Sequence, residues 1–328
     1  MKSIYIAWAS YQRRAVSMQK YLGFSLHHVP PAQGNKLMKM IGYLEQSFAT
    51  VQVVRKQKPE IVWIQLPPNF IVHLLLAWRF ISASRFKIVL DCHNAALRKP
   101  WLSVPFFAAA CRASDLVVVH NAEVLRALPI ELANDRPALI LEDPPSSFDN
   151  VHSTSSHESF VLVPCSFHDD EPIEMILAAA RLVPDITFKI TGRIAKAKAK
   201  GFMQDVPHNV VFTDYVTEEE FNELLHTSAV VAGLTTYEGI QLSVASEAIG
   251  AGKALILSGT RILRNMFQDC ALFFENDEKA FADAVRRSIL DRSAMEFRSK
   301  ESLIRRIEDW NKKAMDINIA LAETNSKQ

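Results

Sequence analysis

The chain has 328 residues, of which 49% are hydrophobic and 22% charged, so it is long and apolar enough to bury the cores of two medium-sized domains. A formal net charge of +1 excludes a global electrostatic attraction to nucleic acid. Four cysteines without CxxC spacing argue against a metal cluster or disulfide framework and indicate a reducing, cytoplasmic compartment.

In the first half, short β-branched runs alternate with helical patterns, which predicts a parallel α/β sheet. The predicted strands are Ile4–Ala7, Ile61–Ile64, Lys87–Leu90, Leu116–Val119 and Ala138–Leu141. Between them, Asn69–Ser84 reads as a helix that is apolar nearly all round, for which core packing is the default and contact with a membrane surface the alternative. Its apolar run, Phe70–Ile81, is too short to span a bilayer.

The run Asp143–Ser159 is rich in Pro, Ser and His and is the best linker candidate in the chain. A second α/β series follows it, with predicted strands at Phe160–Pro164, Thr187–Thr191, Val210–Thr213, Ala229–Ala232, Ala254–Ser258 and Ala271–Phe274. We therefore expect domains at residues 1–150 and 151–300, and a helix with a polar tail at 301–328.

Polar residues stand where strands of the first domain end. Asp91, His93 and Asn94 follow one strand, and His120 and Asn121 follow another. Ligands of open α/β sheets bind outside these carboxyl ends. The alternative is structural: Asp91 and Asn94 cap the next segment, backbone groups satisfy His93, and Asn121 is a helix N-cap with Val124 in the first turn.

The first strand is followed by Tyr11, Gln12, Arg13 and Arg14. These side chains either face an acceptor, with an arginine pairing to its phosphate, or the arginines are solvated at a helix start.

The segment Tyr237–Ser258 carries the strongest signal. It predicts a small-residue loop, a helix with Glu247, a turn at Gly250 and Gly252, and a strand. A carboxylate accepts two charge-assisted hydrogen bonds and suits paired hydroxyls, while free amides at a helix N-terminus face an anion. A sugar or nucleotide needs both features.

This segment resembles the donor-binding segment of retaining GT-B glycosyltransferases of family 4 type (glycosyl transferases group 1), which serve in bacterial polysaccharide biosynthesis. The strand end Ile190–Gly192 and the DCHN run support the resemblance. It implies an α/β fold of two Rossmann-like domains facing each other across a cleft, the first on the acceptor side and the second binding the nucleotide-sugar. A C-terminal helix, Glu301–Ile319, would cross back to the first domain.

The resemblance also implies residue roles. Glu247 would hold the ribose hydroxyls, the backbone of Gln241 and Leu242 would lie near the sugar, and His93 would lie beside the sugar. Gly239 occupies the position of a second family glutamate and Glu238 lies one step further away, so Glu238 is a catalytic candidate only if the loop is bulged.

The acceptor side would include Tyr11, Arg13 and His120. The family's Arg/Lys pair for the donor pyrophosphate is missing after Phe160–Pro164, where the chain has Asp169, Asp170 and Glu171. The remaining phosphate candidates are amides after Ser166, Arg193 beside Gly192, and Arg261. Asp169 and Asp170 are expected to cap a helix.

We thus expect a glycosyltransferase (EC 2.4) that needs no metal or other cofactor. Its partners would be a nucleotide-sugar donor and a polysaccharide or lipid-linked acceptor, with peripheral contact at the inner face of the membrane and no nucleic acid. The alternatives are a nucleotide-sugar epimerase of the same fold and a non-catalytic sugar-nucleotide-binding partner subunit. An NAD-dependent oxidoreductase is disfavoured because no GxGxxG follows a predicted strand.

Overall fold

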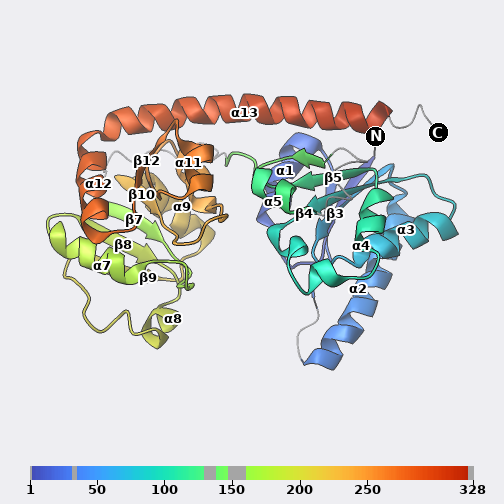
Figure 1. Ribbon diagram of the computed structural model, residues 1–328, viewed down its shortest axis with the longest axis horizontal. Coiled ribbons are helices and arrows are strands. Elements are labelled where there is room, and N and C mark those ends of the chain that lie inside the picture. The colour runs from blue at the N-terminus through green and yellow to red at the C-terminus, as the bar shows by residue number, and fades with distance from the viewer. Residues whose placement is uncertain (1, 32–34, 129–137, 147–159, 324–328) are drawn as a thin grey trace. The chain divides into compact units, whose positions relative to one another are not determined.

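A computed structural model describes residues 2–31, 35–128, 138–146 and 160–323 (Figure 1). It divides into two compact units. The first comprises Met1–Pro144 together with Asp309–Gln328, and the second comprises Pro145–Glu308. Each unit is described by itself below.

The first unit is built on a parallel sheet of six strands in the order β2-β1-β3-β4-β5-β6. The strands are β1 (Ser3–Ala7), β2 (Ser25–His28), β3 (Ile61–Leu66), β4 (Lys87–Cys92), β5 (Leu116–Val119) and β6 (Ala138–Ile140). The helices are α1 (Arg13–Leu22), α2 (Lys36–Gln57), α3 (Ile71–Ile81), α4 (Phe107–Arg112) and α5 (Ala122–Ala127), with 3-10 turns η1 (Asn94–Leu97) and η2 (Trp101–Ser103).

The second unit repeats this architecture, with a parallel sheet in the order β12-β11-β10-β7-β8-β9. The strands are β7 (Phe160–Pro164), β8 (Thr187–Thr191), β9 (Val210–Asp214), β10 (Val230–Gly233), β11 (Ala254–Ser258) and β12 (Ala271–Phe274). The helices are α7 (Ile173–Leu182), α8 (Ile194–Ala199), α9 (Glu218–Thr227), α10 (Ser243–Gly250), α11 (Arg261–Phe267), α12 (Glu278–Leu290) and α13 (Arg292–Glu323).

Each sheet is buried on both faces, which explains why its strands are continuous apolar runs rather than alternating ones. In the first unit, residues of α2, α3, α4 and α5 cover one face, and residues of α1 and α13 cover the other. In the second unit, α7, α8 and α12 pack on one face, and α9, α10 and α11 pack on the other. Because all strands of a sheet are parallel, their carboxyl ends lie along the same side of it, which we call the carboxyl edge. Ligands of such sheets bind there.

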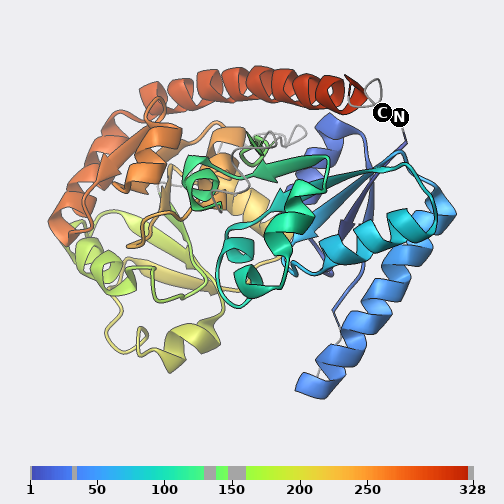
Figure 2. The same cartoon turned by 45° about the vertical axis from the view of Figure 1, so that its right-hand side comes forward.

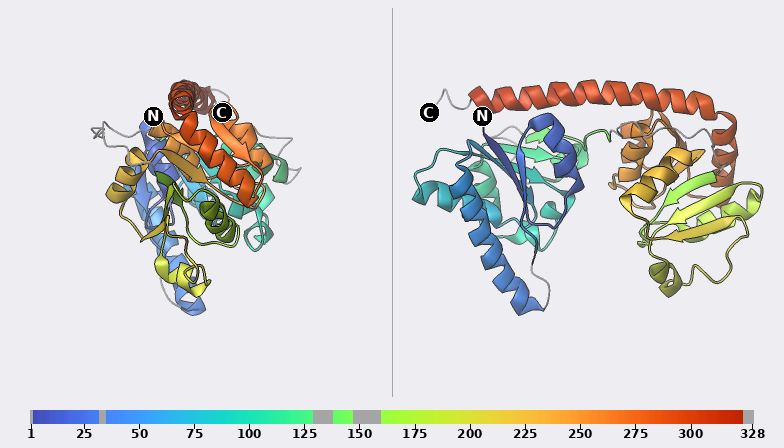
Figure 3. Two further views of the ribbon diagram at one scale, coloured as in Figure 1. Left: turned by 90° about the vertical axis from the view of Figure 1, so that its left-hand side faces the viewer. Right: turned by 180° about the vertical axis from the view of Figure 1, so that it is seen from behind.

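The helix α13 is continuous, and its two halves are grouped with different units (Figure 3). Trp310, Ala314, Ile317 and Leu321 belong to the core of the first unit. The indole of Trp310 packs on Tyr21 with ring centroids 5.1 Å apart, and its Nε1 donates to the carbonyl of Asp143 at 3.3 Å. Burial of these four apolar side chains joins the end of the chain to the sheet formed by its beginning.

The predicted α/β class with two Rossmann-like units and a returning C-terminal helix is confirmed. All eleven strands that the sequence predicts are present within two residues of their expected ends. The strand β2 was not predicted, because Ser25, His27 and His28 leave Leu26 as its single aliphatic residue. Most of the predicted linker, residues 147–159, lies outside the described residues.

Candidate functional site

The carboxyl edge of the second sheet carries the segment that the sequence singles out. As predicted, β10 is followed by a loop, the helix α10 and then β11. Glu247 lies in the middle of α10 and is only 4% exposed. An acid is almost never buried to this extent without polar partners, so its carboxylate belongs to a polar site rather than to the apolar core.

Two glycines fit α10 closely against its surroundings. A Cβ on Gly250 would lie 2.3 Å from the carbonyl oxygen of Ser146, so only glycine allows this approach. A Cβ on Gly233, at the end of β10, would lie 2.9 Å from Val244. Gly252 follows the helix with φ +63°, the left-handed conformation common after a helix end. Backbone packing and conformation thus explain the two glycines of the run, Gly250 and Gly252.

The loop before α10 contains the other donor-side candidates. Glu238 accepts hydrogen bonds from the backbone amide of Arg261 at 3.1 and 3.3 Å, so its carboxylate lies at the N-terminus of α11. Gly239 has φ +78°, which a non-glycine residue rarely adopts. Gln241 and Leu242 are partly exposed, and Leu242 directly precedes α10. Glu238 therefore has a structural role that the sequence did not indicate.

The loop after β7 differs from the expectation of free amides. The backbone amides of Ser166 and His168 both donate to the carboxylate of Glu171, at 2.9 to 3.0 Å. Phe167 between them has φ +55°, so successive amides point to one side and form an anion-binding concavity. The chain's own carboxylate occupies this concavity, so the amides of Ser166 and His168 are not open to a phosphate.

The expectation that Asp169 and Asp170 cap a helix is also wrong. Asp169 pairs with Lys200 at 2.6 Å. Asp170 accepts from the hydroxyl of Thr235 at 2.8 Å, and its carbonyl accepts from the amide of Thr236 at 2.7 Å. The helix α7 begins after Pro172 without a side-chain cap. Asp170 instead ties the loop after β7 to the loop after β10, and both loops follow neighbouring strands.

Gly192 and Arg193 follow β8. A Cβ on Gly192 would lie 2.3 Å from the carbonyl oxygen of Cys165, and φ is +122°, so this position requires glycine. The guanidinium of Arg193 lies over the ring of Tyr215 at 5.5 Å. Asp214 accepts from the amides of Ile194 and Tyr215, and these hydrogen bonds lower the pKa of its carboxyl group. Arg193 thus lies at the carboxyl edge of the sheet, as predicted.

In the first unit, Asp91 is the centre of a buried polar network. Its carboxylate has no exposed surface and accepts from the Tyr5 hydroxyl at 2.7 Å and from Arg14 Nε at 3.1 and 3.2 Å. Arg14 also donates to Asp143 at 2.6 Å and to the carbonyl of Leu141 at 2.7 Å. Burial alone would raise the pKa of Asp91, but the charge of Arg14 and the adjacent His93 hold it well below its usual range.

This network corrects two expectations. Asp91 does not cap the next segment, because its carboxylate is used by Tyr5 and Arg14. For Arg14, both alternatives are wrong: its side chain is neither solvated nor open to an acceptor, since it is 5% exposed. Asn121 does cap α5, because its Oδ1 accepts from the amide of Val124 at 2.9 Å.

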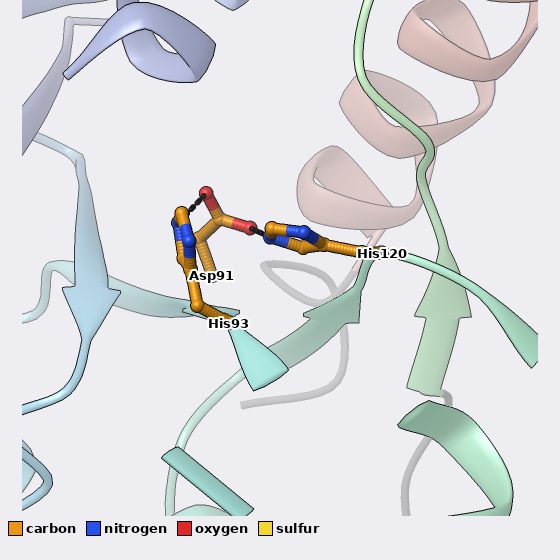
Figure 4. A group of neighbouring side chains, drawn as sticks. All are labelled: Asp91, His93 and His120. Carbon is orange, nitrogen blue, oxygen red and sulfur yellow. Dashed lines mark ion pairs between the residues drawn. The ribbon is translucent and has the colours of Figure 1, made fainter. Parts of the chain in front are cut away.

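Asp91 brings two imidazoles together, as Figure 4 shows. His93 Nε2 lies 3.6 Å from Asp91 Oδ2, and His120 Nε2 lies 3.8 Å from Asp91 Oδ1. The two rings meet edge to face, with centroids 4.3 Å apart. Burial, followed by the charge of Arg14, lowers the pKa of His120 to about 3, so this ring is neutral at physiological pH. His93 is the more exposed of the two and directly follows the strand end.

The ligand atoms of Asp91, His93 and His120 lie within 4.8 Å of one another, a spacing at which they could hold a metal ion. Tyr5 and Arg14 already use most of the lone pairs of this carboxylate, and the guanidinium would repel a cation. The arrangement therefore suits an anchor for the two imidazoles better than a metal centre.

The remaining acceptor-side candidates lie at the start of α1. Tyr11 is 58% exposed and stacks on His28 with centroids 6.4 Å apart. Gln12 is the N-cap, because its side chain accepts from the amide of Arg14. Arg13 is exposed on the first turn. Tyr11 and Arg13 are thus accessible, whereas Gln12 serves the helix.

Comparison with known proteins identifies the second unit. Residues 160–291 match the family model described as Glycosyl transferases group 1. The second unit therefore resembles a group 1 glycosyltransferase domain over these residues. The chain is accordingly a glycosyltransferase, and solved structures show that it has the GT-B fold.

Three of these structures show the extent of the similarity. Sucrose-phosphate synthase from Thermosynechococcus elongatus is 13% identical, with a TM-score of 0.71 and all of both chains covered. HepE from Anabaena, in complex with UDP, is 12% identical with a TM-score of 0.67 and the same coverage. An α,α-trehalose-phosphate synthase (UDP-forming) from Burkholderia vietnamiensis is 12% identical with a TM-score of 0.64, covering 90% of this chain and 80% of the other.

At these identities, the structures show the fold alone. No curated protein matches the chain significantly by sequence. Among the described helices, none is long and apolar enough to cross a membrane.

Sequence reasoning missed Tyr5, Arg14 and Glu171 as members of the two polar sites. Tyr5 lies within an apolar strand run and gave no signal. A buried arginine is detectable only once a buried acid is placed near it. Glu171, two residues before α7, had the ordinary appearance of an acid at a helix start.

Proposed function

We propose that the protein transfers a sugar from a nucleotide-sugar donor, with retention at the anomeric carbon, to a polysaccharide or lipid-linked oligosaccharide. The burial of Glu247 in α10, within the part that matches the group 1 family, carries this proposal. A buried carboxylate at the carboxyl edge of a parallel sheet suits the paired hydroxyls of a ribose.

The other donor contacts follow from the same edge. The loop Glu238–Leu242 would approach the sugar, with Gly239 allowing its turn. Arg193, after Gly192, and Arg261, at the start of α11, are the cations that would face the donor phosphates. No metal enters this proposal, since cationic side chains and helix amides would offset the charge of the leaving diphosphate.

The donor nucleotide is proposed to be UDP. HepE, which shares the fold, was solved with UDP and, in another structure, with UDP and glucose. The similarity is one of fold, and binding measurements with the four nucleotides test the choice of base.

On the acceptor side, His93 would hydrogen-bond the transferring sugar, with Tyr11, Arg13 and His120 nearer the acceptor. The Asp91 carboxylate, 3.6 Å from His93 Nε2 and 3.8 Å from His120 Nε2, would help to position both rings. None of these groups is an activated nucleophile, so catalysis would depend on positioning the reactants and on stabilising the departing diphosphate.

A peripheral membrane contact is proposed for the first unit. Helix α2 extends beyond its sheet (Figure 2), and large apolar side chains of α2 and α3 are exposed. They are Met38, Met40, Ile41, Leu44 and Phe48 on α2, and Phe80 and Ile81 at the end of α3. Such a concentration of exposed apolar residues is uncommon on a soluble surface and is typical of a binding face.

A thermal-shift series with UDP, GDP, CMP and ADP and their sugar conjugates tests the donor site. A ligand at about 100 times its Kd should stabilise the fold by about 2.7 kcal/mol. We expect UDP compounds to stabilise the wild type and Glu247→Ala to lose that response. Glu219→Ala, on the exposed face of α9, is the matched control and should respond as the wild type does. An unchanged response of Glu247→Ala would refute the assignment.

A non-catalytic sugar-nucleotide-binding subunit is the second candidate. The Glu171 carboxylate at the amides of Ser166 and His168 favours it, because a negative charge occupies a concavity suited to a phosphate. Such a protein would bind a nucleotide-sugar yet release no UDP from it, with or without an acceptor. Measured transfer or donor hydrolysis would exclude this candidate.

A further inference from the structure

The opposite edge of the first sheet carries a separate pocket. A cavity of about 720 Å³ is lined by the C-terminal ends of α2 and α3 and by the first residues of β3 and β4. Asp91 lies four residues along β4 from Lys87, which lines the cavity, so the pocket is about 13 Å along the sheet from the Asp91 network. Its volume is in the range of small-molecule sites.

The lining carries an excess of positive charge. Arg55, Lys58, Arg85 and Lys87 line the pocket, and Glu60 is the single acid among the lining residues. The side chains of Arg55, Lys58 and Arg85 are exposed, and none of the three has an ion pair or hydrogen bond to any other residue within the described ranges. Three cations thus surround one opening with no carboxylate bound to them.

Lys87 differs from these three. It is 6% exposed and donates from Nζ to the carbonyl of Leu321 at the end of α13. This bond fixes a positive charge at the floor of the pocket and shows that the floor is built within the core of the unit.

The rest of the floor and one wall are apolar. Val54, Ile61 and Phe86 are nearly fully buried, and the half-buried Trp78 packs against the core that contains Val54 and Phe86. The pocket therefore combines a cationic rim with an aromatic and aliphatic interior. Pockets of this kind bind molecules that have an anionic group and an apolar part.

The positive charge of the rim exceeds the partial negative charge of the two helix C-termini beside it. The C-terminal ends of α2 and α3 each contribute about half a negative charge. The three rim cations exceed this sum even when Glu60 is added, and Arg79 in the last turn of α3 is already paired with Asp115 at 2.8 Å. The site thus retains a positive potential.

We propose that this pocket binds a phosphate-bearing organic molecule, with its phosphate among Arg55, Lys58 and Arg85 and its apolar part against Trp78. Arginine forks bind phosphate oxygens in pairs, which favours a phosphate over a carboxylate. The phosphate belongs either to a soluble phosphate ester or to a lipid headgroup. The site is independent of the donor site and of the Asp91 network.

Calorimetric titration of the full chain at low salt tests the site, with phenyl phosphate, inorganic phosphate and phenol as probes. We expect phenyl phosphate to bind most tightly, because it alone uses both the rim and Trp78. The double variant Arg55→Ala/Arg85→Ala should weaken its binding at least tenfold, since each arginine supplies a charge-assisted hydrogen bond. Lys56→Ala removes an exposed cation from the same turn of α2 outside the pocket and should change Kd less than twofold.

Glu247→Ala separates this proposal from the proposed function. The proposal is supported if Glu247→Ala binds phenyl phosphate as the wild type does while the double variant binds it more weakly. This holds whether or not nucleotide-sugars bind at the donor site. Binding that Glu247→Ala abolishes places the probe at the donor site and overturns the proposal. So does equal weakening by Lys56→Ala, which indicates unspecific charge attraction, or no binding at 10 mM phenyl phosphate.

Sedimentation with vesicles distinguishes the two sources. The pocket is assigned to a lipid headgroup if the protein binds phosphatidylglycerol vesicles, phenyl phosphate competes with this binding, and the double variant no longer binds the vesicles. Binding of phenyl phosphate with no vesicle binding, or with vesicle binding that the double variant retains, assigns it to a soluble phosphate ester. Absence of both kinds of binding overturns the proposal.

Discussion

The substitution Asp91→Asn probes the buried network of the first unit most directly. Asparagine keeps the shape of the side chain and can still accept from Tyr5, but its amide group presents donors to the Arg14 guanidinium, which is itself only a donor. The charge of Arg14 then remains buried with Asp143, whose side chain is 37% exposed, as its remaining acidic partner.

Breaking a buried ion pair by removing one partner costs about 3–5 kcal/mol. Because Asp143 and the carbonyl of Leu141 continue to bind Arg14, we expect the lower end, about 3 kcal/mol. For a unit of this size, that lowers Tm by roughly 6–12 °C.

Urea unfolding followed by tryptophan fluorescence measures the loss of stability of the first unit. All five tryptophans, Trp8, Trp63, Trp78, Trp101 and Trp310, belong to the first unit, so their emission reports its unfolding alone. The control is Asp283→Asn in the exposed pair with Arg286 of the second unit, which should leave the tryptophan transition of the first unit unchanged.

A double variant, Arg14→Met/Asp91→Leu, should recover most of the lost stability, because no fully buried charge is then left unpaired and the released Asp143 carboxylate is 37% exposed to water. If Asp91→Asn costs less than about 1 kcal/mol, Arg14 has found other partners and its pair with Asp91 does not stabilise the unit. That result would refute the reasoning.

Two further predictions concern single residues. Gly250→Ala should destabilise the second unit by about 1–3 kcal/mol, because the added Cβ would lie 2.3 Å from the carbonyl oxygen of Ser146. Circular dichroism during urea unfolding measures this loss. A loss below about 0.5 kcal/mol would show that Ser146 moves away at little cost. His120 makes the stability of the first unit depend on pH. Its native pKa is about 3, so between pH 6.5 and 3 the unfolded chain takes up a proton that the native state does not, and stability falls as pH falls. From pH 6 to 5 the loss is about 1 kcal/mol, and His120→Asn should remove that part of the slope; an unchanged slope in the variant would contradict the assignment.

Much of the fold could be predicted from the sequence, because local residue patterns determine where the strands and helices lie. Continuous β-branched runs such as Leu116–Val119 cannot be exposed, and their alternation with helices leaves a parallel sheet as the natural solution. The helix, turn and strand of Tyr237–Ser258 were equally predictable, because the backbone requires glycine at Gly250 and Gly252. The resemblance to group 1 glycosyltransferases rested on this segment.

Only the tertiary structure determined which polar groups meet. Asp91 and Arg14 are 77 residues apart, and nothing near either one in the sequence indicates that they pair. The same holds for Asp170 and Thr235, and for the cations that surround the pocket at the opposite sheet edge. Periodicity indicates which face of an element is buried, but a charge takes its role from partners that the fold brings within a few ångströms. The sequence therefore determined the framework and the place of Glu247, whereas the protonation, pairing and accessibility of the polar groups were decided by the folded chain.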